Sequence, residues 1–123
     1  MGDISLYFDK SEFDCKCGCS LNVINMTLVG ILDNIRDRMN RPIVILSGCR
    51  CEKHNAEVGG ESNSAHLRGN AVDVESSDSQ FRFFFEKYAY EAGIRRLGEY
   101  KSKPNMIHID VDKENPQDVK WLM

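Results

Sequence analysis

The sequence predicts an α+β domain in which helices pack on one face of a small, mainly antiparallel sheet. Two observations lead to this fold class. Helix-type and strand-type hydrophobic patterns are interleaved along the chain without the regular repeat of crossover units that a parallel sheet requires. The length of 123 residues, with 41% hydrophobic and 28% charged residues, suits one compact domain that covers residues 1–123.

The first half of the chain predicts one helix, one strand and a long loop. Residues 26–39 carry apolar side chains three and four positions apart, which is the spacing of an amphipathic helix. The apolar run at residues 43–46 predicts a short buried strand. Residues 48–70 are polar and glycine-rich, so we expect a long loop with one helical turn. Loops of this length usually carry function.

Two later segments predict strands that each have a polar face. Residues 71–75 alternate in polarity, and Asp73 points away from the apolar side. Residues 106–111 alternate in the same way, with His108 and Asp110 together on the polar face. These faces are therefore where we expect chemistry.

A second helix is predicted between the two strands. Asp78 is the expected N-cap, and Gly93 is the expected stop. We expect the helix to bury an aromatic stripe in the core, formed by Phe81, Phe84, Phe85, Tyr88 and Ala92. A further strand is expected at residues 94–100, and a turn containing Pro104 at residues 101–105.

Charge and hydropathy exclude some classes of function. The net charge of -3 comes without a basic stripe, so we expect no nucleic-acid partner. No apolar run reaches the roughly 18 residues of a membrane helix, so we expect no membrane span. The N-terminus lacks the pattern of a signal peptide, which predicts synthesis in the cytoplasm. We also expect a monomer. An extracellular target would then require phage-type export to the cell wall.

Five cysteines cannot all pair within one chain. Such clusters in a cytosolic protein are more often free thiols or metal ligands than disulfides. We expect partly buried thiols, with one cross-bridge after release into an oxidising space, in preference to a second thiolate zinc site, because structural zinc sites typically use C-x-x-C pairs. A nucleophilic cysteine would need His54 beside Cys51, but His54 is as simply explained as a residue that pins the loop. The cysteines are Cys15, Cys17, Cys19, Cys49 and Cys51.

Two of the three histidines are candidates for a metal site with Asp73. His66 lies in the predicted loop and His108 on the polar face of a predicted strand. Two imidazoles and one carboxylate leave a zinc ion with open positions, which is the ligand count of a catalytic site. A zinc ion of this kind acidifies water and polarises a carbonyl group. The spacing alone is a weak signal, because a strand histidine is often structural.

The surrounding motifs strengthen this interpretation. Residues 64–74 read SAHLRGNAVDV and resemble the S-x-H-x-x-G-x-A-x-D signature of zinc D-Ala-D-Ala carboxypeptidases. Residues 47–50 and 54–60 resemble the S-G-x-R and H-N-x-x-V-G-G segments of the same family, and residues 107–111 resemble its last-ligand strand. The blocks follow the family's order, and the resemblance covers nearly the whole chain.

The resemblance implies the hedgehog/DD-peptidase fold, which phage L-alanyl-D-glutamate endolysins share. It implies one zinc ion per chain, with His66, Asp73 and His108 as the metal ligands. Arg50 becomes the cation that binds the substrate carboxylate or stabilises the tetrahedral oxyanion, and we place Ser64 with Arg50 among the substrate-binding residues.

One position departs from the family pattern. Several relatives have a catalytic glutamate three residues before the last histidine, where this chain has Asn105. Asp110 is our candidate for the catalytic base, because it shares a strand face with His108. A second role for Asp110, orienting the histidine ligand, is equally open. Glu75 and Glu99 are weaker candidates for the base.

The sequence therefore predicts a hydrolase, specifically a zinc metallopeptidase that cleaves peptidoglycan stem or cross-bridge peptides in the cell wall. It would act as a D-Ala-D-Ala carboxypeptidase or as an endolysin-like endopeptidase. The alternative is a non-catalytic, zinc-containing module of the same fold that binds the cell wall or a protein, which Asn105 motivates. A third possibility is a phage component for local wall penetration.

Overall fold

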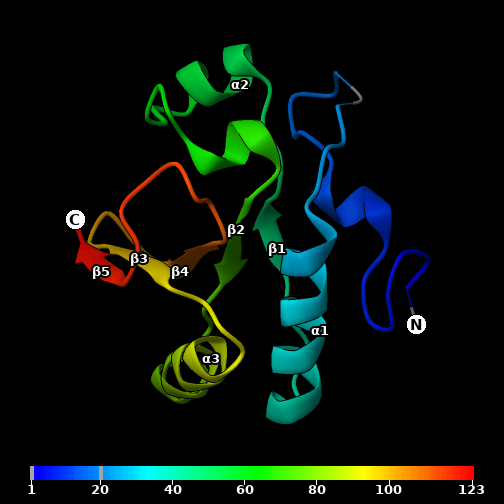
Figure 1. The fold of residues 1–123 in the computed structure, drawn as a ribbon, viewed down its shortest axis with the longest axis vertical. Helices are drawn as coiled ribbons and strands as arrows, with labels where there is room; N and C mark the ends of the chain where they lie inside the picture. Colours follow the sequence, from blue (N-terminus) through cyan, green and yellow to red (C-terminus); the bar gives the residue numbers. More distant parts are fainter. Residues whose placement is uncertain (1, 20) are drawn as a thin grey trace.

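The computed structural model describes residues 2–19 and 21–123, and its centre is a five-stranded sheet with the order β1-β2-β4-β3-β5 (Figure 1). Neighbouring strands are antiparallel except β3 and β5, which are parallel. The predicted α+β class with a mainly antiparallel sheet is confirmed. The strands are β1 (Ile45–Ser47), β2 (Ala71–Glu75), β3 (Arg96–Tyr100), β4 (Lys103–Asp110) and β5 (Val119–Leu122).

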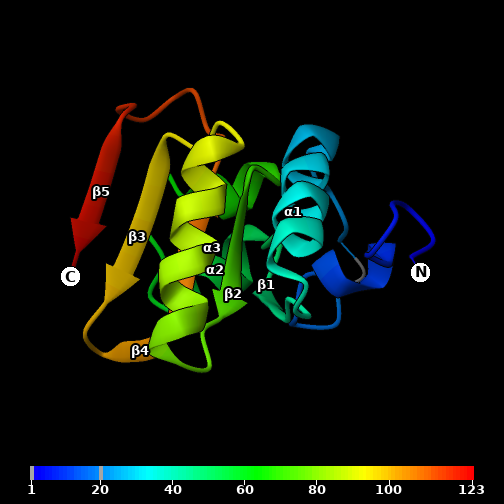
Figure 2. The same cartoon turned by 90° about the horizontal axis from the view of Figure 1, so that it is seen from below.

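Two long helices cover one face of this sheet. Helices α1 (Met26–Met39) and α3 (Ser79–Glu91) lie side by side there, as Figure 2 shows. The short helix α2 (Glu52–Glu57) lies on the other side of the sheet (Figure 1) and contacts the 3-10 helix η2 (Ala65–Arg68). A second 3-10 helix, η1 (Lys10–Phe13), belongs to the N-terminal segment. No helix within residues 2–19 and 21–123 is long and apolar enough to cross a membrane.

Local signals explain where the long helices begin and end. Asn25 caps α1 by accepting a hydrogen bond from the backbone N–H of Thr27. Asp78 caps α3 in the same way through Phe81, as predicted. After α3, Gly93 adopts a φ of +101°, which favours glycine and ends the helix.

The core lies between these helices and the sheet. Leu28, Leu32 and Ile35 of α1 are completely buried against apolar side chains from the strands. Burying one such side chain stabilises the fold by about 1.5–3 kcal/mol. This packing fixes one face of each strand, and so it also fixes the position of the polar face. The strand residues in the core are Ile45, Val72, Val74, Leu97, Ile107 and Ile109.

Four local predictions need correction. The turn expected at residues 101–105 covers only residues 101–102, and Pro104 lies inside β4. The segment 43–46 is not a fully buried strand, because β1 is an edge strand and its side chains alternate; Val44 and Leu46 are 48% and 42% exposed. In α3 the buried stripe is Phe81, Phe85 and Ala89, while Phe84, Tyr88 and Ala92 are only partly buried. The loop 48–70 contains two short helices instead of one turn. Strand β5 was not predicted.

Candidate metal centre

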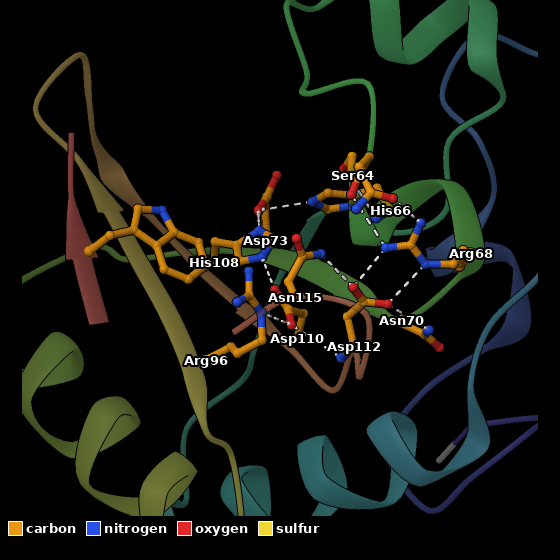
Figure 3. Close-up of polar contacts among 12 residues, drawn as sticks. Ser64, His66, Arg68, Asn70, Asp73, Arg96, His108, Asp110, Asp112 and Asn115 are labelled. Carbon is orange, nitrogen blue, oxygen red and sulfur yellow. Dashed lines mark hydrogen bonds and ion pairs between the residues drawn. The ribbon is translucent and has the colours of Figure 1, made fainter. Parts of the chain in front are cut away.

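The sheet register brings two of the predicted ligands face to face. Asp73 of β2 is the direct cross-strand partner of His108 of β4, on the face opposite the long helices. His66 reaches the same point from η2. The donor atoms of these three residues all lie within 4.8 Å of one another, and all three side chains are buried (Figure 3).

His66 presents one ring nitrogen without a partner. Ser64 caps η2 by accepting a hydrogen bond from the His66 backbone N–H at 3.2 Å. The His66 Nδ1 lies 2.6 Å from the carbonyl oxygen of Gly48. Because a carbonyl can only accept, Nδ1 carries the proton and the lone pair is on Nε2. This Nε2 is buried 3.3 Å from Asp73 Oδ1, yet it makes no hydrogen bond to any described residue. A buried nitrogen of this kind is costly unless it binds something.

His108 is held by two carboxylates. Its Nε2 lies 2.7 Å from Asp110 Oδ2, and its Nδ1 lies 2.9 Å from Asp73 Oδ1. The other oxygen of Asp110 accepts hydrogen bonds from Arg96 Nε at 2.7 Å and from the Asp112 backbone N–H at 3.1 Å. Asp110 is thereby fixed, and it fixes the His108 ring so that Nδ1 faces the metal group. This is a common arrangement behind histidine ligands of metals.

The electrostatics match this geometry. Burial lowers the pKa of His108, but hydrogen bonds to Asp110 and Asp73 and the charges of both carboxylates raise it to about 9. Burial raises the pKa of Asp73, while the hydrogen bond from His108 and the close approach of the His66 ring outweigh burial and hold the pKa well below its usual range. Asp73 is therefore ionised, and a metal ion would replace the proton on His108 Nδ1. The residues present fit a metal ion.

Arg50 lies beside the group, on the segment that follows β1. Its Nη2 lies 3.0 Å from Asp73 Oδ2, and its Nε and Nη1 bond to Ser47 Oγ and Asn55 Oδ1 at 3.2 and 3.1 Å. These contacts use three of the five guanidinium N–H groups. The backbone of Gly60 packs directly against Asn55, and a Cβ at this position would lie only 2.1 Å from Asn55 Oδ1. Arg50 is thus held rigidly with donors to spare.

The group lies in a cleft of about 730 Å³. Two aromatic residues line this cleft, Tyr100 of β3 and Trp121 of β5, and the ring centroid of Trp121 lies 5.3 Å from that of His108. Trp121 lies over Gly98, where a Cβ would come within 2.3 Å of the indole. Arg96 lies over the indole ring, with its guanidinium carbon 5.0 Å from the ring centroid.

A buried ion pair connects the loop ligand to the end of β4. Arg68 of η2 bonds to Asp112 through two nitrogens, at 2.9 and 2.7 Å, and Asp112 is completely buried (Figure 3). Asn70 and Asn115 donate to the same carboxylate. This network holds η2, and with it His66, against the strand that carries His108.

The structure brings most of the predicted site residues together. The cleft is lined by Arg50, Ser64, His66, Asp73, His108 and Asp110. Two weaker candidates do not line it: Glu75 is exposed, and Glu99 bonds to Arg82 on the helix side of the sheet. The sequence interpretation missed several residues at the site, which are Glu61, Arg96, Asp112 and Trp121. Arg96 lies in the predicted strand 94–100 next to the apolar Leu97, so strand alternation would have placed it on the polar face.

Two imidazole nitrogens and one carboxylate, buried at a cleft with an arginine beside them, form a group that could hold one metal ion with positions left open. A comparison with models of protein families matches residues 6–110 to peptidase M15, and the chain therefore belongs to the peptidase M15 family. Peptidases of this family are zinc-dependent, so the chain is a metallopeptidase by family. A search of curated proteins finds no match to the chain.

Proposed function

We propose that this protein is a zinc-dependent peptidase that hydrolyses a peptide bond in peptidoglycan stem or cross-bridge peptides. The observation that carries the proposal is the convergence of His66 Nε2, Asp73 Oδ1 and His108 Nδ1 at the cleft. Imidazole and carboxylate donors suit zinc. The motif blocks that resemble zinc D-Ala-D-Ala carboxypeptidases support a cell-wall peptide as substrate.

A zinc ion held by these residues would polarise the scissile carbonyl and lower the pKa of a water molecule. The chain's own residues then have distinct tasks. Gly48 and Asp110 hold the outer nitrogens of His66 and His108, so that both rings keep one orientation. Arg50 offers its two remaining N–H groups to an anionic oxygen, which is either the substrate carboxylate or the oxygen that becomes negative during attack.

The arginine at the cleft supports a substrate that presents an anionic oxygen there, in either of two ways. A stem peptide that ends in D-Ala carries a free carboxylate, which Arg50 would bind in carboxypeptidase action. In a cross-link the carboxyl of the donor D-Ala is itself part of the scissile amide, and Arg50 would then stabilise the tetrahedral oxyanion in endopeptidase action. Ser64 lies at the same cleft with its Oγ fixed by the His66 N–H, so its own hydroxyl proton is free to bond a substrate carbonyl.

Two carboxylates of the cleft, Asp110 and Glu61, are candidates for the group that transfers the proton. Both oxygens of Asp110 already accept hydrogen bonds, and its side chain is 1% exposed, which supports the orienting role over that of a base. Glu61 also lines the cleft and is exposed. We therefore assign the orienting role to Asp110 and proton transfer to Glu61.

A non-catalytic binding module is the second candidate function. Asn105, which stands where relatives have a catalytic glutamate, is exposed and does not line the cleft. Both oxygens of Asp110 are also occupied by hydrogen bonds. These two observations are the basis for the alternative, a protein that keeps the metal and binds wall peptides without cleaving them. Such a protein would lose stability but no activity on zinc removal.

The deciding experiment is incubation of the purified protein with intact peptidoglycan and with defined stem peptides, with zinc or with a chelator, and identification of products by mass spectrometry. Zinc-dependent release of D-alanine indicates a carboxypeptidase, and a cut within a stem or cross-bridge indicates an endopeptidase. His66→Ala and Asp73→Ala should bring turnover below detection while the far-UV circular dichroism persists.

The matched control is His54→Ala, which removes the one histidine outside the metal group. It should keep the wild-type turnover. Full activity in His66→Ala or Asp73→Ala would contradict the peptidase proposal. Tight zinc binding without any product would favour the binding module.

A further inference from the structure

Four cysteines from two distant parts of the chain converge on one point. Cys15, Cys17 and Cys19 come from the segment after η1, and Cys51 precedes α2. Their sulfur atoms all lie within 4.8 Å of one another. We propose that these four residues form a second metal site, a closed tetrahedral zinc site with four thiolate ligands, separate from the centre in the cleft.

The sulfur positions match the size of such a site. A tetrahedron with zinc–sulfur bonds of about 2.3 Å has sulfur–sulfur edges of about 3.8 Å. The Sγ atoms of Cys15 and Cys17 are 3.5 Å apart, and those of Cys17 and Cys51 are 3.7 Å apart. A disulfide instead requires about 2.05 Å between two sulfurs and would use only one pair. The four-membered cluster therefore fits one shared ion better than isolated pairs.

Backbone amides already point at two of the sulfurs. The Cys51 N–H donates to Cys15 Sγ at 3.3 Å, and the His54 N–H donates to Cys51 Sγ at 3.3 Å. Such hydrogen bonds stabilise the negative charge of thiolate ligands. Gly18 allows three ligands within five residues, because its φ of +84° reverses the chain between Cys17 and Cys19.

The fifth cysteine has a different environment. Cys49 is buried, and its single S–H proton lies within hydrogen-bonding reach of two carbonyl oxygens, those of Phe13 and Leu21, at Sγ–O distances of 3.3 and 3.2 Å. It is not part of the four-sulfur group. The odd number of cysteines is thus explained by four metal ligands and one hydrogen-bonded thiol. It also makes Cys49 a natural control.

The site would connect the N-terminal segment to the segment that carries Arg50. Cys49 and Cys51 flank Arg50, and the Cys49 N–H already bonds to Phe13 O at 3.1 Å. A zinc ion at Cys51 would hold this segment one residue from the arginine beside the cleft. The ion would be structural, because four protein ligands leave it no open position.

Metal content and a cobalt spectrum test the proposal independently of peptidase activity. The protein is purified with zinc under reducing conditions, and zinc and iron per chain are measured by mass spectrometry. We expect two zinc ions in the wild type and in Cys49→Ser, and one in Cys17→Ser/Cys19→Ser. In His66→Ala/His108→Ala, which lacks the first centre, we expect one zinc, and replacement by cobalt should give sulfur-to-cobalt charge-transfer absorption.

Several results would overturn the second site. These are an unchanged zinc content in Cys17→Ser/Cys19→Ser, iron in place of zinc, or a mass that shows disulfides among the four cysteines in the reduced preparation. If the serine variant does not fold, the cobalt spectrum of His66→Ala/His108→Ala still decides, because its cysteines are intact. Absence of thiolate absorption there would refute the site even if the protein proves to be an active peptidase.

Discussion

Replacing Asp110 by asparagine would separate the two roles that the sequence leaves open for it. The carboxylate accepts from His108 through one oxygen, and from Arg96 and the Asp112 N–H through the other. Asparagine has a single acceptor oxygen, so one of these sides must lose its partner. If Asp110 orients His108, the substitution weakens the hold on a metal ligand without touching the proton-transfer chemistry.

The expected magnitude follows from the contact with His108. Loss of the group that orients a histidine ligand typically lowers metal affinity about 10–100-fold, which is about 1.4–2.7 kcal/mol. Turnover should therefore fall at low zinc and return to within a few-fold of the wild type when zinc saturates the site. A general base behaves differently, because its removal costs about 10²–10⁴-fold in kcat at full metal occupancy.

The assay is a zinc titration against a competing chelator, followed by kcat at saturating zinc, for the wild type and Asp110→Asn. Asp118→Asn is the matched control, since Asp118 also pairs with an arginine but is 69% exposed and does not line the cleft. An unchanged zinc affinity combined with a loss of 10²-fold or more in kcat would refute the orienting role. If Glu61 transfers the proton, Glu61→Gln should keep the zinc affinity of the wild type and lower kcat at saturating zinc.

Two further predictions concern the frame of the site. Hydrogen bonds from Arg68 lower the pKa of Asp112 to about 2. The ionised Asp112 therefore stabilises the fold at pH values above the unfolded pKa of about 3.9. About 2 kcal/mol of the free energy of unfolding should be lost as the pH falls towards 2. Urea unfolding at several acidic pH values should show that Asp112→Asn removes this part of the pH dependence; an identical dependence in the variant would contradict it. Gly98→Ala places a Cβ 2.3 Å from the Trp121 ring, so it should cost about 1–3 kcal/mol and shift the fluorescence of the single tryptophan. Unchanged fluorescence and stability would show that the indole does not occupy this position.

The sequence predicted the elements whose signals are local. The helix at residues 26–39 follows from side-chain spacing, and its bounds agree with α1. The polar faces of β2 and β4 follow from alternation, and their pairing places Asp73 opposite His108. Alternation therefore predicts the face on which each residue lies, while the register that sets Asp73 opposite His108 is known only from the structure.

The missed features depend on contacts between distant residues. Strand β5 is short and half exposed, and it exists through parallel pairing with β3, which local patterns do not encode. Asp112 looks like an ordinary residue after a strand until Arg68 is placed beside it. The cysteine cluster is similar, because the spacing of Cys15, Cys17 and Cys19 is unusual for zinc and the fourth sulfur comes from Cys51.

The site is a product of the sheet's register more than of any single motif. One cross-strand row runs over all five strands, from Ser47 through Asp73, His108 and Gly98 to Trp121. Ser47 holds Arg50, the next two residues supply metal donors, and Gly98 leaves room for the indole that covers His108. A slip of one residue in any pairing would turn a member of this row into the core. The burial of the opposite faces against α1 and α3 therefore stabilises the fold and, by the same contacts, keeps the metal group assembled.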